Sequence, residues 1–131
     1  MNGSIIDTNV IIKMLHNDPE AISLLQKVKK AYVSPIIRGE LYFGAYKSLR
    51  CEANMELFRN TLSKFEMLSL DDDNITLSYA HIKSELEKKG KKIPENDLWI
   101  AATAHFYGLS VATFDTHFSY ISQIQLVPFS N

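Results

Sequence analysis

Short apolar runs alternate along this chain with longer stretches in which apolar residues recur every three or four positions. The short runs are bounded by polar or turn-forming residues, which is typical of β-strands. They lie at residues 3–6, 31–33, 67–70, 110–113 and 124–127. Because strands that alternate with helices usually form a parallel sheet covered on both faces, we predict an α/β fold with a mostly parallel five-stranded sheet.

Capping residues mark three of the helices between these strands. A serine followed by proline at positions 34 and 35 predicts a helix over residues 34–49. A second helix is expected to begin at Asp73 or Asn74, to carry an apolar stripe at helical spacing, and to end at Gly90. A third is predicted over residues 94–108, which begin with proline and end with glycine.

Composition places this chain among ordinary globular proteins. Its 131 residues fit a single domain over residues 1–131, with 46% hydrophobic and 22% charged residues. The net charge of −1 gives no overall basic field, so a nucleic-acid site would have to be a local patch. The single cysteine, Cys51, excludes an internal disulfide, and neither a leader nor a membrane-spanning run is visible. We therefore expect a cytoplasmic protein that makes no use of a membrane.

Two acidic residues come just after predicted strands. Asp7 comes after the apolar pair at positions 5 and 6, and Asp115 comes after the apolar run at 111–114. In open α/β sheets, ligands bind at the edge where parallel strands end. Alternatively, Asp7 is only a helix cap, and Asp115 only begins a turn with Thr116.

Glu40 lies in the middle of a predicted helix rather than at its end. Its neighbours one turn away, Ile36 and Gly44, place it on a face that is otherwise apolar or small. An acid at such a position is expected to point into a cleft. The alternative is a structural ion pair with Arg38 or Lys47.

Asp97 begins another helix, where a carboxylate is favourable for the helix dipole alone. Small residues further along that helix would bring its first turn close to the sheet and to Asp7. Carboxylates gathered at one place repel unless a cation neutralises them, and oxygen ligands of this kind suit Mg²⁺ or Mn²⁺. Such a cation polarises a phosphate and activates water. We therefore predict a metal-dependent nuclease whose metal-binding and catalytic residues are Asp7, Glu40, Asp97 and Asp115.

Four segments in this order resemble the PIN-domain family, in particular the VapC toxins of bacterial toxin–antitoxin pairs. They are residues 5–12, 34–45, 93–104 and 112–118. The resemblance implies a PIN-like three-layer α/β/α fold and assigns the metal and the catalysis to the same four acids. It also gives Thr8 and Asn9 a supporting role.

The resemblance further implies a Mg²⁺-dependent endoribonuclease of single-stranded RNA such as tRNA or rRNA, a homodimer, and inhibition by a cognate antitoxin protein. Two other functions stay open: a catalytically silent PIN-like module that binds RNA or protein, and an aspartate-nucleophile phosphatase. The phosphatase is disfavoured because Asn9 stands where that chemistry uses a second aspartate. The first and third predicted helices carry more apolar surface than they should need. Core packing explains most of it, and a groove for an antitoxin helix is the alternative that the resemblance implies. The residues concerned are Ile11, Ile12, Met14, Leu15, Tyr42, Phe43 and Tyr46.

Two further features have an open role. Many relatives carry an acid or asparagine where this chain has His117. We expect this histidine to be a local turn or packing residue. The alternative is that it contacts a substrate phosphate or a leaving oxygen. A dense basic run just before Asp97 either ends a helix in solvent or binds RNA phosphates. Its members are Lys88, Lys89, Lys91 and Lys92.

Overall fold

A parallel sheet lies at the centre of the protein in the computed structural model, which describes residues 3–128. The strands described are β1 (Ser4–Ile6), β2 (Ala31–Val33), β3 (Glu66–Met67) and β4 (Ser110–Ala112). Their order is β3-β2-β1-β4, and all pairs are parallel. The predicted α/β class with a parallel sheet is therefore confirmed.

The predicted fifth strand is wrong. Within residues 3–128 the sheet has four strands, and the segment 124–127 makes only an isolated parallel bridge between Leu126 and Val111. Val111 donates its N–H to the carbonyl of Gln125, and Val127 donates to the carbonyl of Val111. Pairing cannot be extended through Pro128, because proline has no N–H to donate.

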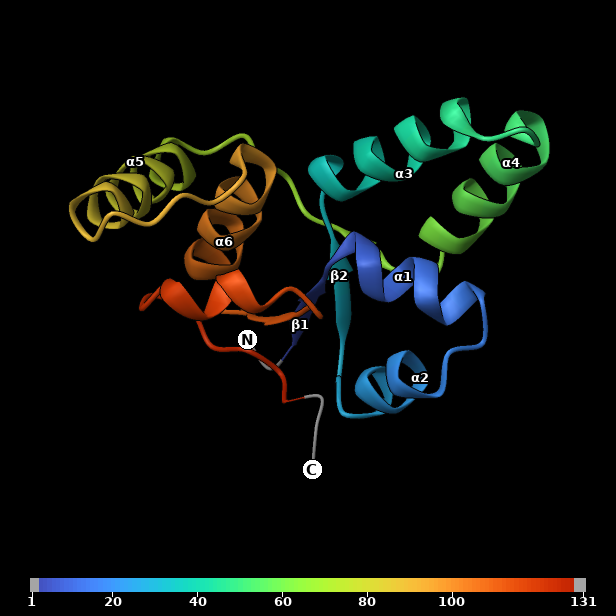
Figure 1. Cartoon of the computed structure of the whole chain (residues 1–131), viewed down its shortest axis with the longest axis horizontal. Coiled ribbons are helices and arrows are strands. Elements are labelled where there is room, and N and C mark those ends of the chain that lie inside the picture. Colours follow the sequence, from blue (N-terminus) through green and yellow to red (C-terminus); the bar gives the residue numbers. More distant parts are fainter. Residues whose placement is uncertain (1–2, 129–131) are drawn as a thin grey trace.

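Six α-helices and one short 3₁₀-helix connect and follow the strands within the described residues. They are α1 (Thr8–Leu15), α2 (Pro19–Gln26), α3 (Pro35–Lys47), α4 (Cys51–Leu62), α5 (Asp73–Lys88), α6 (Glu95–Tyr107) and η1 (Thr116–Tyr120). α5 and α6 lie together on one side of the sheet, and α1 to α4 lie toward the other side (Figure 1). The sheet is thus flanked by helices, as the sequence predicts.

The helix caps differ in detail from the expected ones. Asp72, not Asp73 or Asn74, caps α5, and its carboxylate accepts the N–H of Asn74. Ser34 precedes α3, but its buried hydroxyl has no hydrogen-bond partner, so the predicted side-chain cap is absent. The helix begins with Pro35 in its first turn, and the carbonyl of Ser34 accepts the N–H of Arg38. Gly108 ends α6 with φ at 68°, a left-handed conformation that glycine adopts at little cost.

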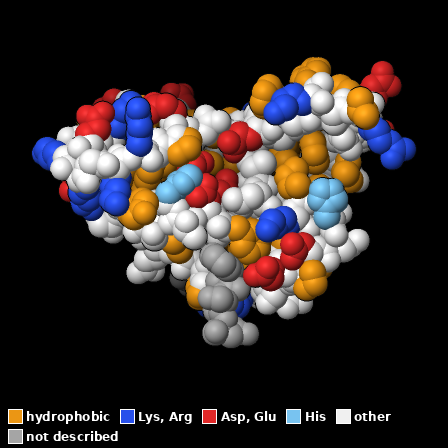
Figure 2. Space-filling view, in the orientation of Figure 1, with side chains coloured by type: hydrophobic (Ala, Val, Ile, Leu, Met, Phe, Trp, Pro, Cys, Tyr) orange, Lys and Arg blue, Asp and Glu red, His pale blue; other side chains and the backbone are white. Residues whose placement is uncertain are grey.

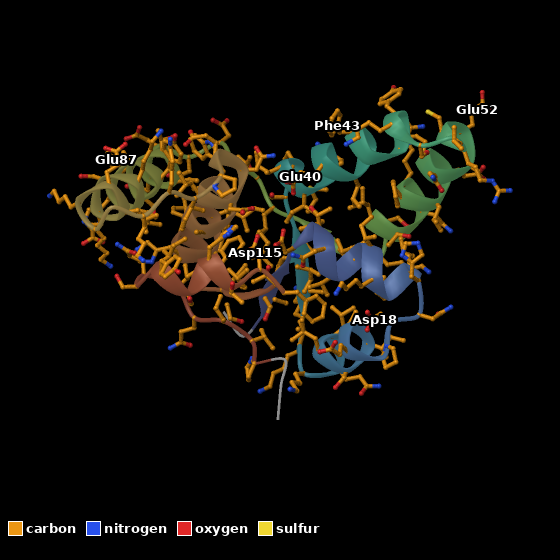
Figure 3. All side chains as sticks on the ribbon, in the orientation of Figure 1. Asp18, Glu40, Phe43, Glu52, Glu87 and Asp115 are labelled. Carbon is orange, nitrogen blue, oxygen red and sulfur yellow. The ribbon has the colours of Figure 1, made fainter. Side chains whose placement is uncertain are left out.

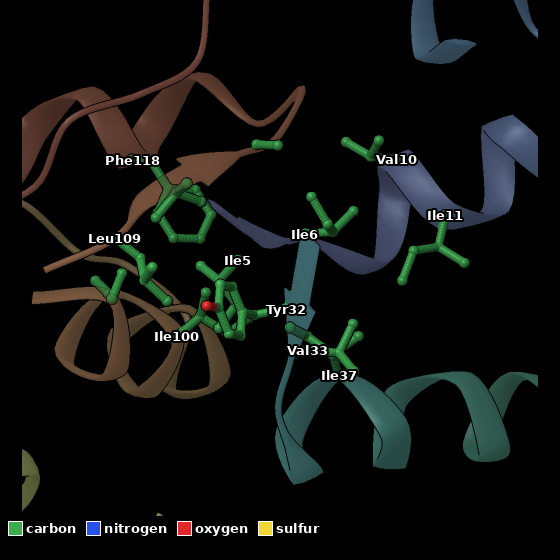
Figure 4. Close-up of a cluster of buried hydrophobic side chains, with 14 of the residues drawn as sticks. Ile5, Ile6, Val10, Ile11, Tyr32, Val33, Ile37, Ile100, Leu109 and Phe118 are labelled. Atoms are coloured by element: carbon green, nitrogen blue, oxygen red, sulfur yellow. The ribbon is translucent and has the colours of Figure 1, made fainter. Parts of the chain in front are cut away.

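The core lies between the sheet and the helices (Figure 4). Ile5 and Ile6 of β1 are fully buried, because alternate residues of a strand face the helices on opposite sides. Ala101 and Ala104 of α6 are also fully buried. These small side chains let α6 pack closely on β1 and β4, which brings its first turn to the edge where the strands end. In residues 3–128, no helix combines the length and apolar character that crossing a membrane requires.

Candidate active site

All four predicted acids line a single cavity of about 700 Å³. Asp7 follows β1, Glu40 projects from α3, Asp97 lies in the first turn of α6, and Asp115 begins η1. Acidic side chains gather in a hollow on this face of the molecule (Figure 2). Glu40 and Asp115 lie toward the middle of the molecule in this view, whereas Asp18, Glu52 and Glu87 lie toward its outside (Figure 3).

Asp7 is both a helix cap and a buried member of this cavity. One carboxylate oxygen accepts the N–H of Thr8 at 2.8 Å, and the other accepts the hydroxyl of Thr113 at 2.7 Å. The residue is only 5% exposed. Burial raises the pKa of Asp7 to about 6, with the charges of Asp97 and Glu40 acting in the same direction and the two hydrogen bonds opposing them. The two alternatives for this residue are therefore compatible.

Glu40 is held by neighbours from two other elements. Its carboxylate accepts the hydroxyl of Thr8 at 2.6 Å and the side-chain amide of Asn96 at 3.3 Å. No ion pair joins it to Arg38 or Lys47 in the described part of the chain, and the ammonium of Lys47 lies over the ring of Phe43 instead. Glu40 therefore faces the cavity rather than a basic residue of its own helix.

Asp97 and Asp115 lie on either side of His117. Nε2 of the histidine is 2.7 Å from Oδ2 of Asp97, and Nδ1 is 2.8 Å from Oδ1 of Asp115. Asp115 also accepts the backbone N–H of His117 and so caps η1. Burial raises the pKa of Asp97, as do the charges of Asp115 and Glu40, whereas the hydrogen bond and the charge of His117 lower it.

His117 is the site residue whose position differs most from our expectation. A neutral imidazole has one N–H, yet both ring nitrogens here face carboxylate oxygens, which only accept hydrogen bonds when ionised. The two contacts therefore require either a protonated ring or a protonated carboxyl. His117 is not simply a turn or packing residue. Its spacing, two positions after an acid that closely follows a strand, is the sequence signal that could have identified it.

The compact part of this site consists of Asp97, Asp115 and His117. Each offers a possible metal ligand, and these atoms all lie within 4.8 Å of one another. Asp7 and Glu40 line the same cavity outside this compact group, bound to Thr113, Thr8 and Asn96. Carboxylate and imidazole donors suit a divalent cation. The pKa values of Asp7 and Asp97 are raised first by burial and then by neighbouring carboxylates, and a bound cation would favour the charged forms of both groups. The donor set therefore fits a divalent metal.

The two supporting residues make specific contacts. Thr8 contacts both Asp7 and Glu40, as described above, and so links β1 to α3. The side-chain oxygen of Asn9 accepts the N–H of Phe114 at 3.2 Å, which fixes the segment that leads to Asp115. Lys13, which the sequence did not single out, also lines the acidic cavity.

The basic run is divided between two environments. Lys91 and Lys92 line a second cavity of about 540 Å³, which shares Pro94 and Glu95 with the acidic one. Lys88 and Lys89 end α5 as exposed residues and do not line this second cavity. Only half of the run therefore lines a cavity that shares lining residues with the acidic one.

The architecture and the acidic edge of the sheet correspond to a known class. The PIN domain family model matches residues 4–123, and this chain belongs to the PIN-domain family, among the VapC ribonucleases. Ribonuclease VapC2 of Haemophilus influenzae is 39% identical over 106 residues, which are 79% of this chain and 80% of the relative. The tRNA(fMet)-specific endonuclease VapC of Salmonella typhimurium is 33% identical over 110 residues, covering 82% and 83% of the two chains.

A solved structure gives the same result for the fold. The chain in the DNA-bound VapBC structure from Salmonella typhimurium superimposes with a TM-score of 0.85 and 31% identity. The match covers 96% of this chain and 97% of that one. The similarity therefore extends through the elements that carry the four acids.

Proposed function

We propose that this protein is a Mg²⁺-dependent endoribonuclease of single-stranded RNA and the toxin of a toxin–antitoxin pair, with the described fold acting as one nuclease domain. The observation that carries the proposal is the convergence of the four acids on one cavity at the strand ends. The VapC ribonuclease relatives support the reaction class. The tRNA(fMet) specificity of the Salmonella relative makes tRNA the first substrate to test.

In this proposal the metal ligands are Asp7, Glu40, Asp97 and Asp115. The bound cation would polarise the scissile phosphate and lower the pKa of the attacking water. Thr8 and Thr113 orient Glu40 and Asp7, because their hydroxyls donate to these carboxylates. Asn9 fixes the backbone before Asp115. Lysines of the basic run would hold the RNA phosphates on either side of the cut.

The cognate antitoxin is the protein partner in this proposal. VapC relatives occur in solved VapBC structures, and the similarity to one of them extends over nearly the whole chain. Phe43 and Tyr46 of α3 are 62% and 73% exposed, which supports a role for them in binding this partner, whereas Ile11 is buried in the core. The predicted homodimer and cytoplasmic location stay predictions; light scattering of the purified protein tests the first.

Cleavage of RNA in the presence and absence of a divalent metal tests the proposed function. We expect Mg²⁺ or Mn²⁺ to support cleavage of tRNA and chelation to abolish it. Asp7→Asn or Asp97→Asn should each reduce the rate at least about a hundredfold, because each removes charge stabilisation of several kcal/mol. Asp18→Asn is the matched control, since Asp18 caps α2 far from the site (Figure 3).

Two results would contradict this function. Full cleavage in excess EDTA would falsify the metal-dependent mechanism. RNA binding without any cleavage, under every metal condition, would instead favour the catalytically silent PIN-like module.

A further inference from the structure

A histidine is built into the acidic site, between two of its carboxylates. The side chains of His117, Asp97 and Asp115 are 28%, 12% and 32% exposed. The ring is placed by a well-packed segment, because the next residue, Phe118, is fully buried in the core and Asp115 accepts the backbone N–H of His117. The imidazole is therefore held at the site rather than extended into solvent.

The kinds of ligand atom at this position matter for the choice of metal. Carboxylate oxygens suit Mg²⁺ and Mn²⁺, whereas an imidazole nitrogen favours first-row transition ions over Mg²⁺, which strongly prefers oxygen. Asp97, Asp115 and His117 offer two oxygens and one nitrogen within 4.8 Å of one another. A cation held by the two aspartates would therefore have a ring nitrogen within reach where a site built only from acids offers a further carboxylate.

We propose that His117 is a nitrogen ligand of the cation held by Asp97 and Asp115, and that it makes this site select Mn²⁺ over Mg²⁺. The inference rests on the proposed function, because it requires a cation at this site. The competing role for His117 is that of a cationic ring that merely neutralises the two aspartates. The two roles predict opposite effects of removing the ring: a ligand strengthens metal binding, whereas a competing cation weakens it.

Electron paramagnetic resonance of bound Mn²⁺ distinguishes these roles without an activity assay. In the full chain with Mn²⁺ added, electron spin-echo modulation should reveal a directly coordinated ¹⁴N nucleus. Labelling the protein with ¹⁵N-histidine should change that signal to the ¹⁵N pattern. This measurement uses the unmodified sequence and does not depend on whether a variant folds.

Substitution then identifies which histidine is the ligand. In His117→Gln the nitrogen signal should disappear, and the Mn²⁺ dissociation constant should rise at least about tenfold. The Mg²⁺ constant, measured by competition, should change by less than about threefold, because Mg²⁺ gains little from nitrogen. The matched control is His81→Gln, an exposed residue of α5. A variant with Gln at His16, His81 and His105 should keep the signal, and it supplies the assignment if His117→Gln fails to fold.

The outcomes separate this inference from the proposed function. If Mn²⁺ does not bind the wild-type protein, both are overturned. If Mn²⁺ binds and Asp97→Asn abolishes that binding, but no histidine nitrogen is detected, the metal site stands and the role of His117 is wrong. Tighter Mn²⁺ binding by His117→Gln would equally overturn the inference, since it would identify the ring as a competing cation.

Discussion

The hydroxyl of Thr113 donates a buried hydrogen bond of 2.7 Å to Oδ2 of Asp7. Thr113 directly follows β4 and Asp7 directly follows β1, and these two strands are neighbours in the sheet. The same hydroxyl oxygen accepts the N–H of Asp115 at 3.0 Å. One threonine therefore connects two acids that are far apart in the sequence, because adjacent parallel strands end at the same edge.

Removing this hydroxyl should weaken both the fold and the acidic site. In Thr113→Val we expect the free energy of unfolding to fall by about 1–3 kcal/mol, since the buried carboxylate loses a hydrogen bond. The pKa of Asp7 should rise further above its ordinary value, because that hydrogen bond lowers it. Denaturant unfolding and carboxyl NMR titration measure the two quantities.

Thr103→Val is the matched control for this substitution. Thr103 is also fully buried, but its hydroxyl donates to the carbonyl of Trp99 within α6. The control should leave the pKa of Asp7 unchanged. An equal pKa for Asp7 in Thr113→Val and wild type would contradict the role assigned to Thr113.

The stability of the metal-free protein should decrease as the pH rises through the pKa of Asp7. The folded protein holds the Asp7 proton up to about pH 6, whereas the unfolded chain loses it near 3.8. Between these two pH values the folded state binds more protons than the unfolded chain. The contribution of Asp7 to the free energy of unfolding is therefore most favourable below pH 4 and disappears by about pH 7. The decrease amounts to roughly 3 kcal/mol.

A comparison with Asp7→Asn isolates this contribution. Asparagine at this position still caps α1 but does not titrate. The free energy of unfolding of Asp7→Asn, relative to that of wild type, should therefore rise between pH 4 and 6 and then level off. Urea unfolding at several pH values, with chelator present, checks the prediction. A difference between the two proteins that does not change with pH would contradict it.

Metal binding should stabilise the fold, because the site exists only in the folded chain. Mg²⁺ or Mn²⁺ at about a hundred times its dissociation constant should add roughly 2.7 kcal/mol. Asp97→Asn should be at least as stable as wild type without metal, since burial disfavours the charged form of Asp97, and it should lose most of the response to metal.

Thermal unfolding of both proteins, with metal and with chelator, measures these effects. An N-cap aspartate outside the site provides the control. Asp72 caps α5 and does not line the acidic cavity. Asp72→Ala should cost about 1 kcal/mol both with and without metal. If the melting temperature of the wild-type protein does not respond to either ion, the four acids do not form a metal site.

Local rules of the sequence predicted most of the fold. β1 and the helix after Ser34 could be predicted because an apolar run ends in an acid and a proline follows a serine. The fifth strand could not, because whether residues 124–127 pair depends on how far the neighbouring strand extends beside them. Strand length is set by tertiary contacts, which a local pattern does not contain.

The site shows the same division between local and long-range information. Asp7 and Asp115 could be located because each follows a strand, and the alternation of strands and helices places such residues at one edge. The contact of His117 with Asp97 could not be predicted, because twenty positions separate them and the contact depends on how η1 packs beside α6. Histidine also has no fixed charge that would mark it as a partner of acids.

The two halves of the basic run should differ in their contribution to RNA binding. Lys91 and Lys92 line the cavity that shares Pro94 and Glu95 with the acidic one, whereas Lys88 and Lys89 do not. Changing Lys91 and Lys92 to Gln should weaken RNA binding and reduce the slope of log affinity against log salt by roughly 0.7 for each RNA phosphate that the variant no longer neutralises. The same change at Lys88 and Lys89 should have a smaller effect, although it removes the same charge from the same segment.

Binding of single-stranded RNA by catalytically inactive Asp7→Asn, over a series of salt concentrations, measures both slopes. Equal slopes for the two double variants would mean that net charge, rather than position beside the acidic site, governs the interaction with RNA.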